Sequence, residues 1–170
     1  TERIVTPQAQ ADYYARYWDK LWQGKSYLYA KLVEALRSVR LAAIGSTDLQ
    51  PIDGAQVIKG ANRFNKDTAL GCDLMDTWIW QHLTQEQAEA VAEFLNTVET
   101  LVAWPIQTLL NFIVLMGKPA GGVRPIALMP MIYRLWTKIR RNYMADWESE
   151  HAGPWDAAVK GSSALRAAIY

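Results

Sequence analysis

Two short apolar segments on either side of a glycine-rich turn constrain the fold of this chain more than any other feature of its sequence. The first runs from Phe112 to Met116 and the second from Val123 to Leu128, with Gly117 to Gly122 between them. Short apolar runs joined by a turn that contains glycines are typical of a β-hairpin. Pro125 lies inside the second run and has no N–H to donate, so that strand is predicted to be an edge strand or locally unpaired.

An amphipathic helix pattern begins directly after this hairpin, at Met129 and Pro130. Arg134, Lys138 and Arg141 lie on one face of it, at spacings that bring like charges together. Each such pair costs an isolated helix about 0.2–0.5 kcal/mol, which a bound polyanion or screening by salt would offset. We expect contact with nucleic acid. The opposite face is one apolar stripe, made of Ile132, Leu135, Trp136, Ile139, Tyr143 and Trp147.

The basic residues of this region have no acidic residues near them in the sequence. No Asp or Glu occurs between Glu99 and Asp146. The formal net charge of the whole chain is only +1. A nearly neutral protein with one strongly positive segment suits an anionic partner such as a phosphate group or a nucleic acid. The six cations of the segment are Lys118, Arg124, Arg134, Lys138, Arg140 and Arg141.

The N-terminal part of the chain has the pattern of two helices. Thr6 and Pro7 form a helix start, and apolar residues follow at helical spacing up to Gly24. We expect this helix and a second one to pack as a pair over residues 1–45, followed by a loose or short helical connector over residues 46–70. In the second helix, Tyr27 to Ala43, the residues predicted to point inward are Leu28, Leu32, Ala35, Leu36 and Val39. The connector contains three cations that could contact a phosphate group of a ligand, although a solvated loop is the favoured interpretation. They are Lys59, Arg63 and Lys66.

Residues 71–170 form the third predicted segment. Asp73 is expected to cap a short helix, which carries Met75, Trp78, Ile79, His82 and Leu83. Thr84 and Gln87 match a capping box, which begins a longer helix that ends before Trp104 and Pro105. Together with the hairpin, these helices predict an α+β fold, mostly helical with one antiparallel β-hairpin.

Composition excludes several other classes of protein. The 170 residues can bury the core of one domain, and the single cysteine, Cys72, excludes a scaffold built on internal disulfides. His82 and His151 are far apart and have no Cys or His neighbours at zinc spacing, so we expect no metal site on them. No apolar run approaches the ~20 residues of a membrane span, and no signal-peptide pattern opens the chain. We therefore expect no membrane partner.

Eight tryptophans are many for a chain of this length. Their large rings contribute to a core when their N–H groups find partners. Four of them fall at helical core spacing: Trp18, Trp22, Trp136 and Trp147. Packing in the core is the favoured interpretation of all four, and stacking on a nucleobase is the alternative for one of them.

The sequence Leu-Met-Gly-Lys-Pro-Ala-Gly-Gly-Val-Arg-Pro-Ile-Ala-Leu-Met-Pro-Met-Ile-Tyr-Arg, residues 115–134, resembles the fingers region of reverse transcriptases of the non-LTR retroelement and group II intron kinds. Gly71-Cys72-Asp73 resembles the Gly-x-Asp element that precedes this region in the family. Residues 157–168 are similar to the family stretch that ends in a Gly-x-Ser-Ser/Thr helix start. The order and spacing of the three elements agree with the family, although Gly117 stands where the family usually has Pro. The Gln that commonly precedes the last element is not evident.

This resemblance implies the N-terminal and fingers portion of a right-hand RNA-directed DNA polymerase, a nucleotidyltransferase, with an incomplete palm. Lys118 and Arg124 would contact the phosphates of an incoming deoxynucleotide. Family members hold two Mg²⁺ ions with palm aspartates, and nothing after Gly161 offers these ligands. We expect no catalytic or metal-binding residue in this chain and no polymerisation by the chain alone. Three clustered carboxylates are expected to be a solvated helix end: Asp146, Glu148 and Glu150.

The resemblance also implies partners inside the cell, in the nucleus or the cytoplasm. These are an RNA or DNA template–primer and the remaining palm and thumb of the parent polymerase. Two other interpretations stay open: a non-catalytic nucleic-acid-binding module and the fingers of an RNA-directed RNA polymerase. The residues expected to contact nucleic acid are Arg134, Lys138, Arg141, Ser162 and Ser163.

Overall fold

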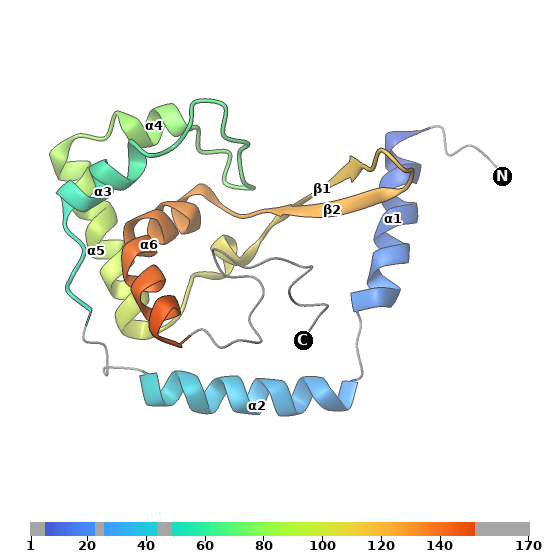
Figure 1. Cartoon of the computed structure of the whole chain (residues 1–170), viewed down its shortest axis with the longest axis horizontal. Helices are drawn as coiled ribbons and strands as arrows, with labels where there is room; N and C mark the ends of the chain where they lie inside the picture. The colour runs from blue at the N-terminus through green and yellow to red at the C-terminus, as the bar shows by residue number, and fades with distance from the viewer. Residues whose placement is uncertain (1–5, 23–25, 44–48, 152–170) are drawn as a thin grey trace. The chain divides into compact units, whose positions relative to one another are not determined.

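The computed structural model describes residues 6–22, 26–43 and 49–151 (Figure 1), and the chain divides into two compact units, residues 1–47 and 48–170. Within the described ranges, the secondary structure consists of six α-helices, one 3-10 helix and one antiparallel pair of strands. The predicted fold class, α+β and mostly helical with one β-hairpin, is confirmed.

The first unit contains two helices, α1 (Pro7–Trp22) and α2 (Ser26–Ala43). The predicted start of α1 is confirmed, because the Thr6 hydroxyl oxygen accepts a hydrogen bond from the Ala9 N–H at 3.2 Å. The inward orientation predicted for three side chains of α2 is wrong, since Leu32, Leu36 and Val39 are between 54% and 66% exposed. The helix therefore carries an exposed apolar stripe.

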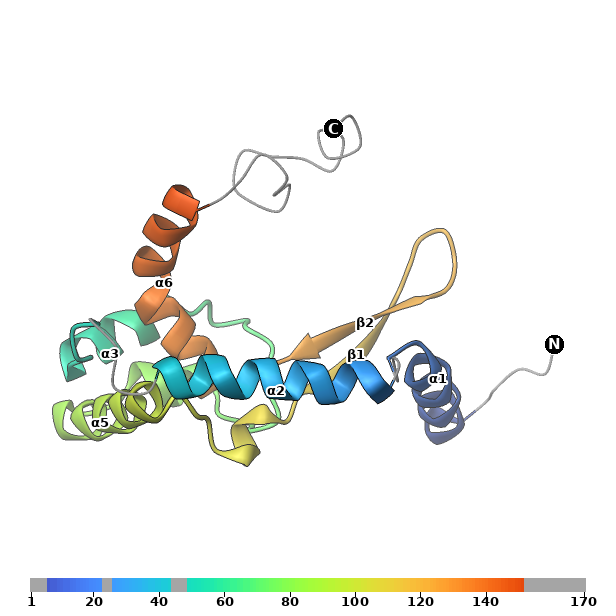
Figure 2. The ribbon, with the colours of Figure 1, turned by 90° about the horizontal axis from the view of Figure 1, so that it is seen from below.

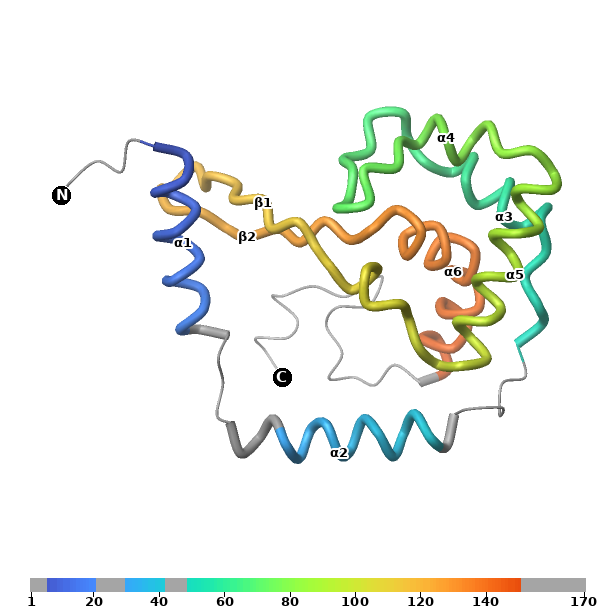
Figure 3. The backbone as a smooth tube through the Cα atoms, turned by 180° about the vertical axis from the view of Figure 1, so that it is seen from behind, coloured from blue at the N-terminus to red at the C-terminus, as the bar shows by residue number. Residues whose placement is uncertain are grey.

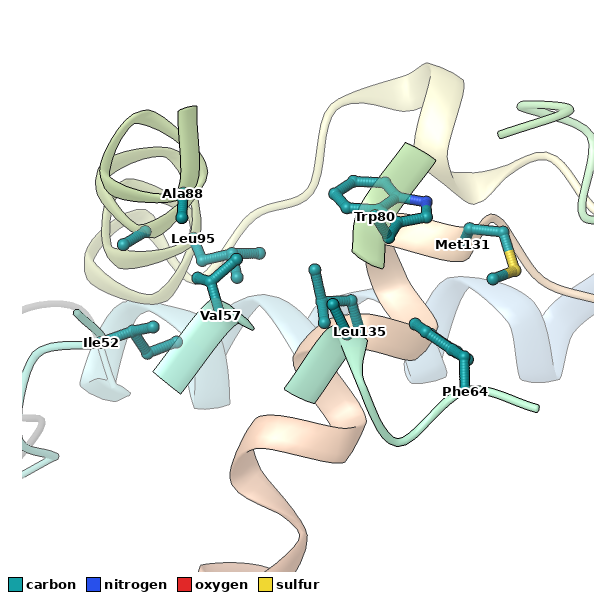
Figure 4. Close-up of a cluster of buried hydrophobic side chains, with 10 residues drawn as sticks. Ile52, Val57, Phe64, Trp80, Ala88, Leu95, Met131 and Leu135 are labelled. Atoms are coloured by element: carbon teal, nitrogen blue, oxygen red, sulfur yellow. The ribbon is translucent and has the colours of Figure 1, made fainter. Parts of the chain in front are cut away.

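The second unit is organised around three helices, α3 (Gly54–Ala61), α5 (Gln85–Leu101) and α6 (Met131–His151). α3 lies against both α5 and α6 (Figures 1 and 3), and it also contacts the short α4 (Thr77–Gln81). Within the region expected to be a connector, Val57 and Ala61 of α3 are fully buried. The apolar faces of the helices meet in one cluster (Figure 4), which includes Ile52, Val57, Phe64, Trp80, Ala88, Leu95, Met131 and Leu135.

Local sequence accounts for the start of α5 and for the close approach of α3 to α6. The predicted capping box is confirmed: the Thr84 hydroxyl accepts from the Gln87 N–H at 3.2 Å, and the Gln87 side-chain oxygen accepts from the Thr84 N–H at 2.9 Å. At Gly60 of α3, a Cβ atom would lie 2.8 Å from Cγ1 of Ile139 and 3.1 Å from Cδ1 of Leu135. Glycine at this position therefore lets the two helix backbones come together.

The N-terminus of α6 is capped by a residue that is distant in sequence. The Asp73 carboxylate accepts a hydrogen bond from the Met131 N–H at 2.6 Å. The prediction that Asp73 caps the short helix is therefore wrong, and Asp76 caps α4 instead. Gly71 lies so close to the start of α6 that a Cβ atom there would be 2.3 Å from the Met129 carbonyl oxygen. The Gly-x-Asp element is thus packed against the segment that joins the hairpin to α6.

α4 buries one of its three consecutive apolar side chains and exposes the other two. Trp78 and Ile79 are 62% and 40% exposed, whereas Trp80 is only 2% exposed. His82 stacks on the exposed Trp78 ring, with 4.3 Å between the ring centroids. Apolar residues occupy three consecutive positions of this helix, so periodicity could not decide which of them faces the core.

β1 (Phe112–Gly117) and β2 (Val123–Leu128) form the predicted antiparallel hairpin, after a 3-10 helix η1 (Ile106–Leu109). The Lys118 N–H donates to the Gly122 carbonyl at 2.9 Å, and the Gly121 N–H donates to the Lys118 carbonyl at 3.0 Å. Gly121 and Gly122 have φ angles of +88° and +81°, a region in which glycine is favoured. In a two-stranded sheet both strands are edge strands, as Pro125 predicts. The hairpin extends away from the helices of its unit (Figures 1 and 2).

Candidate nucleic-acid interface

Basic residues from two distant parts of the second unit meet beside the first half of α6. The Lys138 ammonium donates a hydrogen bond to the Arg63 carbonyl at 3.2 Å, and the Arg63 guanidinium donates to the Lys138 carbonyl at 3.2 Å. Phe64 lies beneath two of these charges, 4.8 Å from the Lys138 Nζ atom and 6.0 Å from the Arg134 Cζ atom, measured to the ring centre. Arg141 is exposed on the next turn of α6. We call Arg63, Arg134, Lys138 and Arg141 the cationic cluster.

Arg134 has a structural contact in addition to its charge. Its guanidinium donates a hydrogen bond to the Ala69 carbonyl at 2.6 Å and lies 3.2 Å from the Met131 sulfur. The side chain is half-buried. Arg134 therefore holds the loop that follows α3 against the start of α6, and only part of its guanidinium faces outward.

The electrostatics of Lys138 show that the cluster is under internal repulsion. Burial lowers the pKa of the Lys138 ammonium below its ordinary value, and the positive charges of Arg134, Arg141 and Arg63 lower the pKa further. Among the residues that the structure describes, no carboxylate forms an ion pair with a member of the cluster. A ligand that brings negative charge to this surface would relieve the repulsion.

Arg140 belongs to the same basic segment but does not belong to the cluster. Its guanidinium forms an ion pair with Glu99 at 2.5 Å, and both side chains are almost completely buried. The Trp136 Nε1–H donates to the same carboxylate at 2.7 Å. The Trp136 ring packs edge-on against Trp104, so the packing interpretation of Trp136 is confirmed. Arg140 therefore anchors α6 to α5 and contributes no free positive charge to the surface.

The apolar stripe predicted for α6 covers only the first half of the helix. Leu135 is fully buried, and Ile139 is half-buried. Tyr143 and Trp147, farther along the stripe, are 54% and 52% exposed. The second half of α6 thus extends past the core, and the cationic cluster lies on the half that the core holds in place.

The hairpin carries the two residues expected to bind nucleotide, Lys118 and Arg124, and both are exposed. Arg124 pairs with Met116 across the sheet, and Lys118 lies two residues beyond Met116. Alternation along a strand therefore favours the same face for both cations. They belong to the projecting hairpin (Figure 2), whereas three of the four members of the cationic cluster belong to α6. Two further predicted contacts with nucleic acid, Ser162 and Ser163, lie outside the described residues.

Arg63 is the member of the cluster that sequence reasoning missed. A solvated loop was the favoured interpretation of Lys59, Arg63 and Lys66; Arg63 is an exposed turn residue, and it also contacts α6. The residue lies 75 positions from Lys138 in the sequence. No pattern within the connector indicates this contact, because it is created by the packing of α3 against α6.

Comparison with known proteins adds no family to this picture. No protein-family model and no curated protein matches the sequence. The interpretation of the cationic cluster therefore rests on its own geometry and charge.

The residues that the structure describes do not provide a carboxylate set for a divalent metal. Within those residues, no group of three or more His, Cys, Asp or Glu side chains gathers at one place. Asp146, Glu148 and Glu150 are all exposed on the second half of α6. This donor set does not fit the Mg²⁺ pair that the resemblance implies for a complete polymerase.

In the same described part of the chain, none of the helices combines the length and apolar character that crossing a membrane requires.

The lowered pKa of Lys138 predicts how binding should respond to pH. Between pH values of about 7 and about 10, the affinity of the wild-type chain for oligo(dA) should fall more than that of Lys138→Arg. The lowered pKa means that the ammonium loses its proton at a lower pH than an ordinary lysine, whereas a guanidinium stays charged throughout this range. Fluorescence anisotropy at constant ionic strength measures the affinity. Lys59→Arg, at an exposed lysine outside the cluster, is the control and should follow the wild-type curve. Superimposable pH profiles for Lys138→Arg and the wild type would contradict a contribution of the Lys138 charge to oligonucleotide binding.

Proposed function

We propose that this chain is the fingers portion of an RNA-directed DNA polymerase and that its cationic cluster holds the sugar–phosphate backbone of a template–primer. The cluster is the observation that carries the proposal. Four cations from α6 and the loop after α3 gather with no ion-pairing carboxylate among the described residues, and burial together with the charges of the other three lowers the pKa of Lys138. Uncompensated positive charge on a rigid surface is what sequence-independent binding to nucleic acid requires.

The reverse-transcriptase class of the proposed polymerase comes from the resemblance of residues 115–134. In this proposal, Lys118 and Arg124 on the hairpin contact the triphosphate of an incoming deoxynucleotide. The turn between them suits that role, because Gly121 and Gly122 let the backbone approach a phosphate closely. The hairpin and the cluster would then bind two different ligands, a triphosphate and a polynucleotide.

The proposed contribution of this part of the chain to catalysis is binding and orientation. In a complete polymerase of this kind, two Mg²⁺ ions held by palm aspartates stabilise the attacking and leaving oxygens. The described residues of this chain would position the template–primer and the nucleotide relative to each other. No step of the reaction is assigned to them.

A non-catalytic nucleic-acid-binding module is the second candidate, because the cationic cluster alone would suffice for it. The two candidates differ in nucleotide binding. A module of this kind would bind single-stranded nucleic acid through the cluster but would not bind a triphosphate through Lys118 and Arg124. The fingers of an RNA-directed RNA polymerase would prefer a ribonucleoside triphosphate to a deoxynucleotide.

The experiment compares two sets of substitutions. Arg63→Gln, Lys138→Gln and Arg141→Gln together should lower the affinity for a single-stranded oligonucleotide and reduce the slope of log K against log salt concentration by about 2, since each lost phosphate contact removes about 0.7. Lys118→Ala with Arg124→Ala should instead weaken the binding of a deoxynucleoside triphosphate. Anisotropy titrations across a series of salt concentrations measure the first effect, and isothermal titration calorimetry measures the second.

A charge-matched variant separates a local site from a general effect of net charge. Arg16→Gln, Lys31→Gln and Arg37→Gln remove the same number of charges from exposed positions of α1 and α2, and this variant should keep the wild-type salt slope. Equal slopes for both triple variants would rule out the cluster as the binding site. Two results together would favour the non-catalytic module. The triple variant of the cationic cluster would lose oligonucleotide binding, and Lys118→Ala/Arg124→Ala would leave triphosphate binding unchanged.

A further inference from the structure

The two edges of the β1–β2 sheet differ in their capacity to pair with another strand. Hydrogen-bonded and non-hydrogen-bonded pairs alternate along an antiparallel ladder. The Lys118 N–H bonds to the Gly122 carbonyl, so these residues form a hydrogen-bonded pair at the turn. Counting back along the register, Val114 and Met116 also bond to β2, while Ile113 and Leu115 direct their N–H and C=O groups to the outer edge of β1.

The outer edge of β2 is blocked at its centre. Pro125 lies opposite Leu115, at a non-hydrogen-bonded pair, so its ring nitrogen faces away from β1. Proline has no N–H, and a strand approaching this edge would lack a donor at that point. The outer edge of β1 contains no proline, and its outward groups have no hydrogen-bond partner in the part of the chain that the structure describes. Strand addition is therefore favoured at one edge only.

The side chains of β1 also leave this edge uncovered. Phe112, Ile113, Val114 and Met116 are between 41% and 47% exposed, on both faces of the hairpin. An isolated two-stranded hairpin is at best marginally stable in water, and further strands provide the apolar contacts that stabilise it. β1 is thus a neutral, apolar strand whose outer edge is left unpaired by the described residues, and such an edge is the kind that pairs with another strand.

We propose that the outer edge of β1 pairs with the same edge of a second copy of this chain, antiparallel about a two-fold axis at Leu115. The register would place Ile113 opposite Gly117 of the partner subunit. Because the axis is two-fold, each copy contributes the same backbone N–H and C=O groups to the pairing. Charge is compatible with this pairing, because β1 carries no charged side chain and Lys118 would lie opposite Phe112 of the partner subunit rather than opposite a like charge. The product is a four-stranded sheet whose two outer edges both carry Pro125, so assembly stops at the dimer.

Sedimentation velocity of the full chain tests the proposal. The wild type should sediment as a concentration-dependent dimer, and Leu115→Pro should raise the dissociation constant of the dimer at least about tenfold, because it removes the central N–H of the pairing edge. Leu115→Ala keeps that N–H and should keep the dimer. Pro125 lies opposite Leu115 at a non-hydrogen-bonded pair, so the β1–β2 ladder tolerates a proline at that pair. Circular dichroism checks that Leu115→Pro keeps its fold. A wild type that remains a monomer, or a dimer that survives Leu115→Pro, would overturn the proposal.

A second variant tests why assembly stops. Pro125→Thr supplies the missing N–H on the outer edge of β2 and should convert the dimer into larger assemblies. Hydrogen exchange gives a direct readout, since the Ile113 and Leu115 amides should be protected in the wild-type dimer. Protection of these amides in a monomer would assign the edge to another segment of the same chain and would refute the pairing of two copies. Pro125→Thr that stays a dimer would refute closure by proline.

Discussion

Replacing Glu99 with alanine is expected to lower the free energy of unfolding of the second unit by about 3–5 kcal/mol. The Glu99 carboxylate accepts hydrogen bonds from the Arg140 Nε at 2.7 Å, the Arg140 Nη2 at 2.5 Å and the Trp136 Nε1 at 2.7 Å. Both charged side chains are only about a tenth exposed. Without the carboxylate, the only partner left to the buried guanidinium among the described residues is the Gln50 carbonyl, at 2.9 Å. An unpaired buried charge is far more costly than the loss of a surface ion pair.

Urea unfolding followed by circular dichroism measures this effect. Glu93→Ala, which removes an exposed carboxylate from the same helix, is the matched control and should change the free energy of unfolding by no more than about 0.5 kcal/mol. The double variant Glu99→Leu/Arg140→Met should recover much of the loss, because no buried charge then remains unpaired. If Glu99→Ala and Glu93→Ala were equally stable, the ion pair would not be what holds α6 to α5.

Leu135→Ala is expected to lower the free energy of unfolding by about 2–5 kcal/mol, since it creates a cavity in the centre of the core. Leu135 is fully buried and belongs to the cluster shown in Figure 4. Its Cδ1 atom also lies close to Gly60 of α3, so the side chain contributes to the α3–α6 contact. That contact brings Arg63 to Lys138, and the variant should therefore also weaken oligonucleotide binding at temperatures where it remains folded.

Two variants on the same helix set the scale for Leu135→Ala. Leu135→Met conserves most of the volume and should cost less than about 1.5 kcal/mol. Met144→Ala removes an apolar side chain that is 52% exposed, and its effect should lie within about 0.5 kcal/mol. Thermal and urea unfolding measure all three. A Leu135→Ala variant as stable as Met144→Ala would show that the core does not depend on this side chain.

The features that were predicted from the sequence depend on residues close to one another along the chain. The capping box joins Thr84 to Gln87, and the hairpin turn closes between Lys118 and Gly122. Such features are encoded locally, because the interacting groups are a few bonds apart whatever the rest of the chain does. The α+β fold class could be predicted for the same reason, since it needs only the sum of local elements.

The features that were not predicted depend on packing between distant segments. Asp73 caps α6 rather than the helix beside it, because Gly71, two residues before it, lies against Met129 and Pro130. Arg63 joins the cationic cluster only when α3 packs on α6. Arg140 is one of the six cations of the basic segment, yet its partner Glu99 is 41 residues away and lies on α5. A list of charges along a sequence cannot separate paired from unpaired ones.

The contact between Asp73 and the Met131 N–H also bears on the order of folding. The two residues are 58 positions apart, so the first turn of α6 gains its cap only after a long loop has closed, at a substantial cost in chain entropy. The Thr84 cap needs no such closure and can form within microseconds in an otherwise unfolded chain. We therefore expect α5 to be the earlier helix and the start of α6 to be a late event, which makes the basic surface one of the last parts of the molecule to take shape.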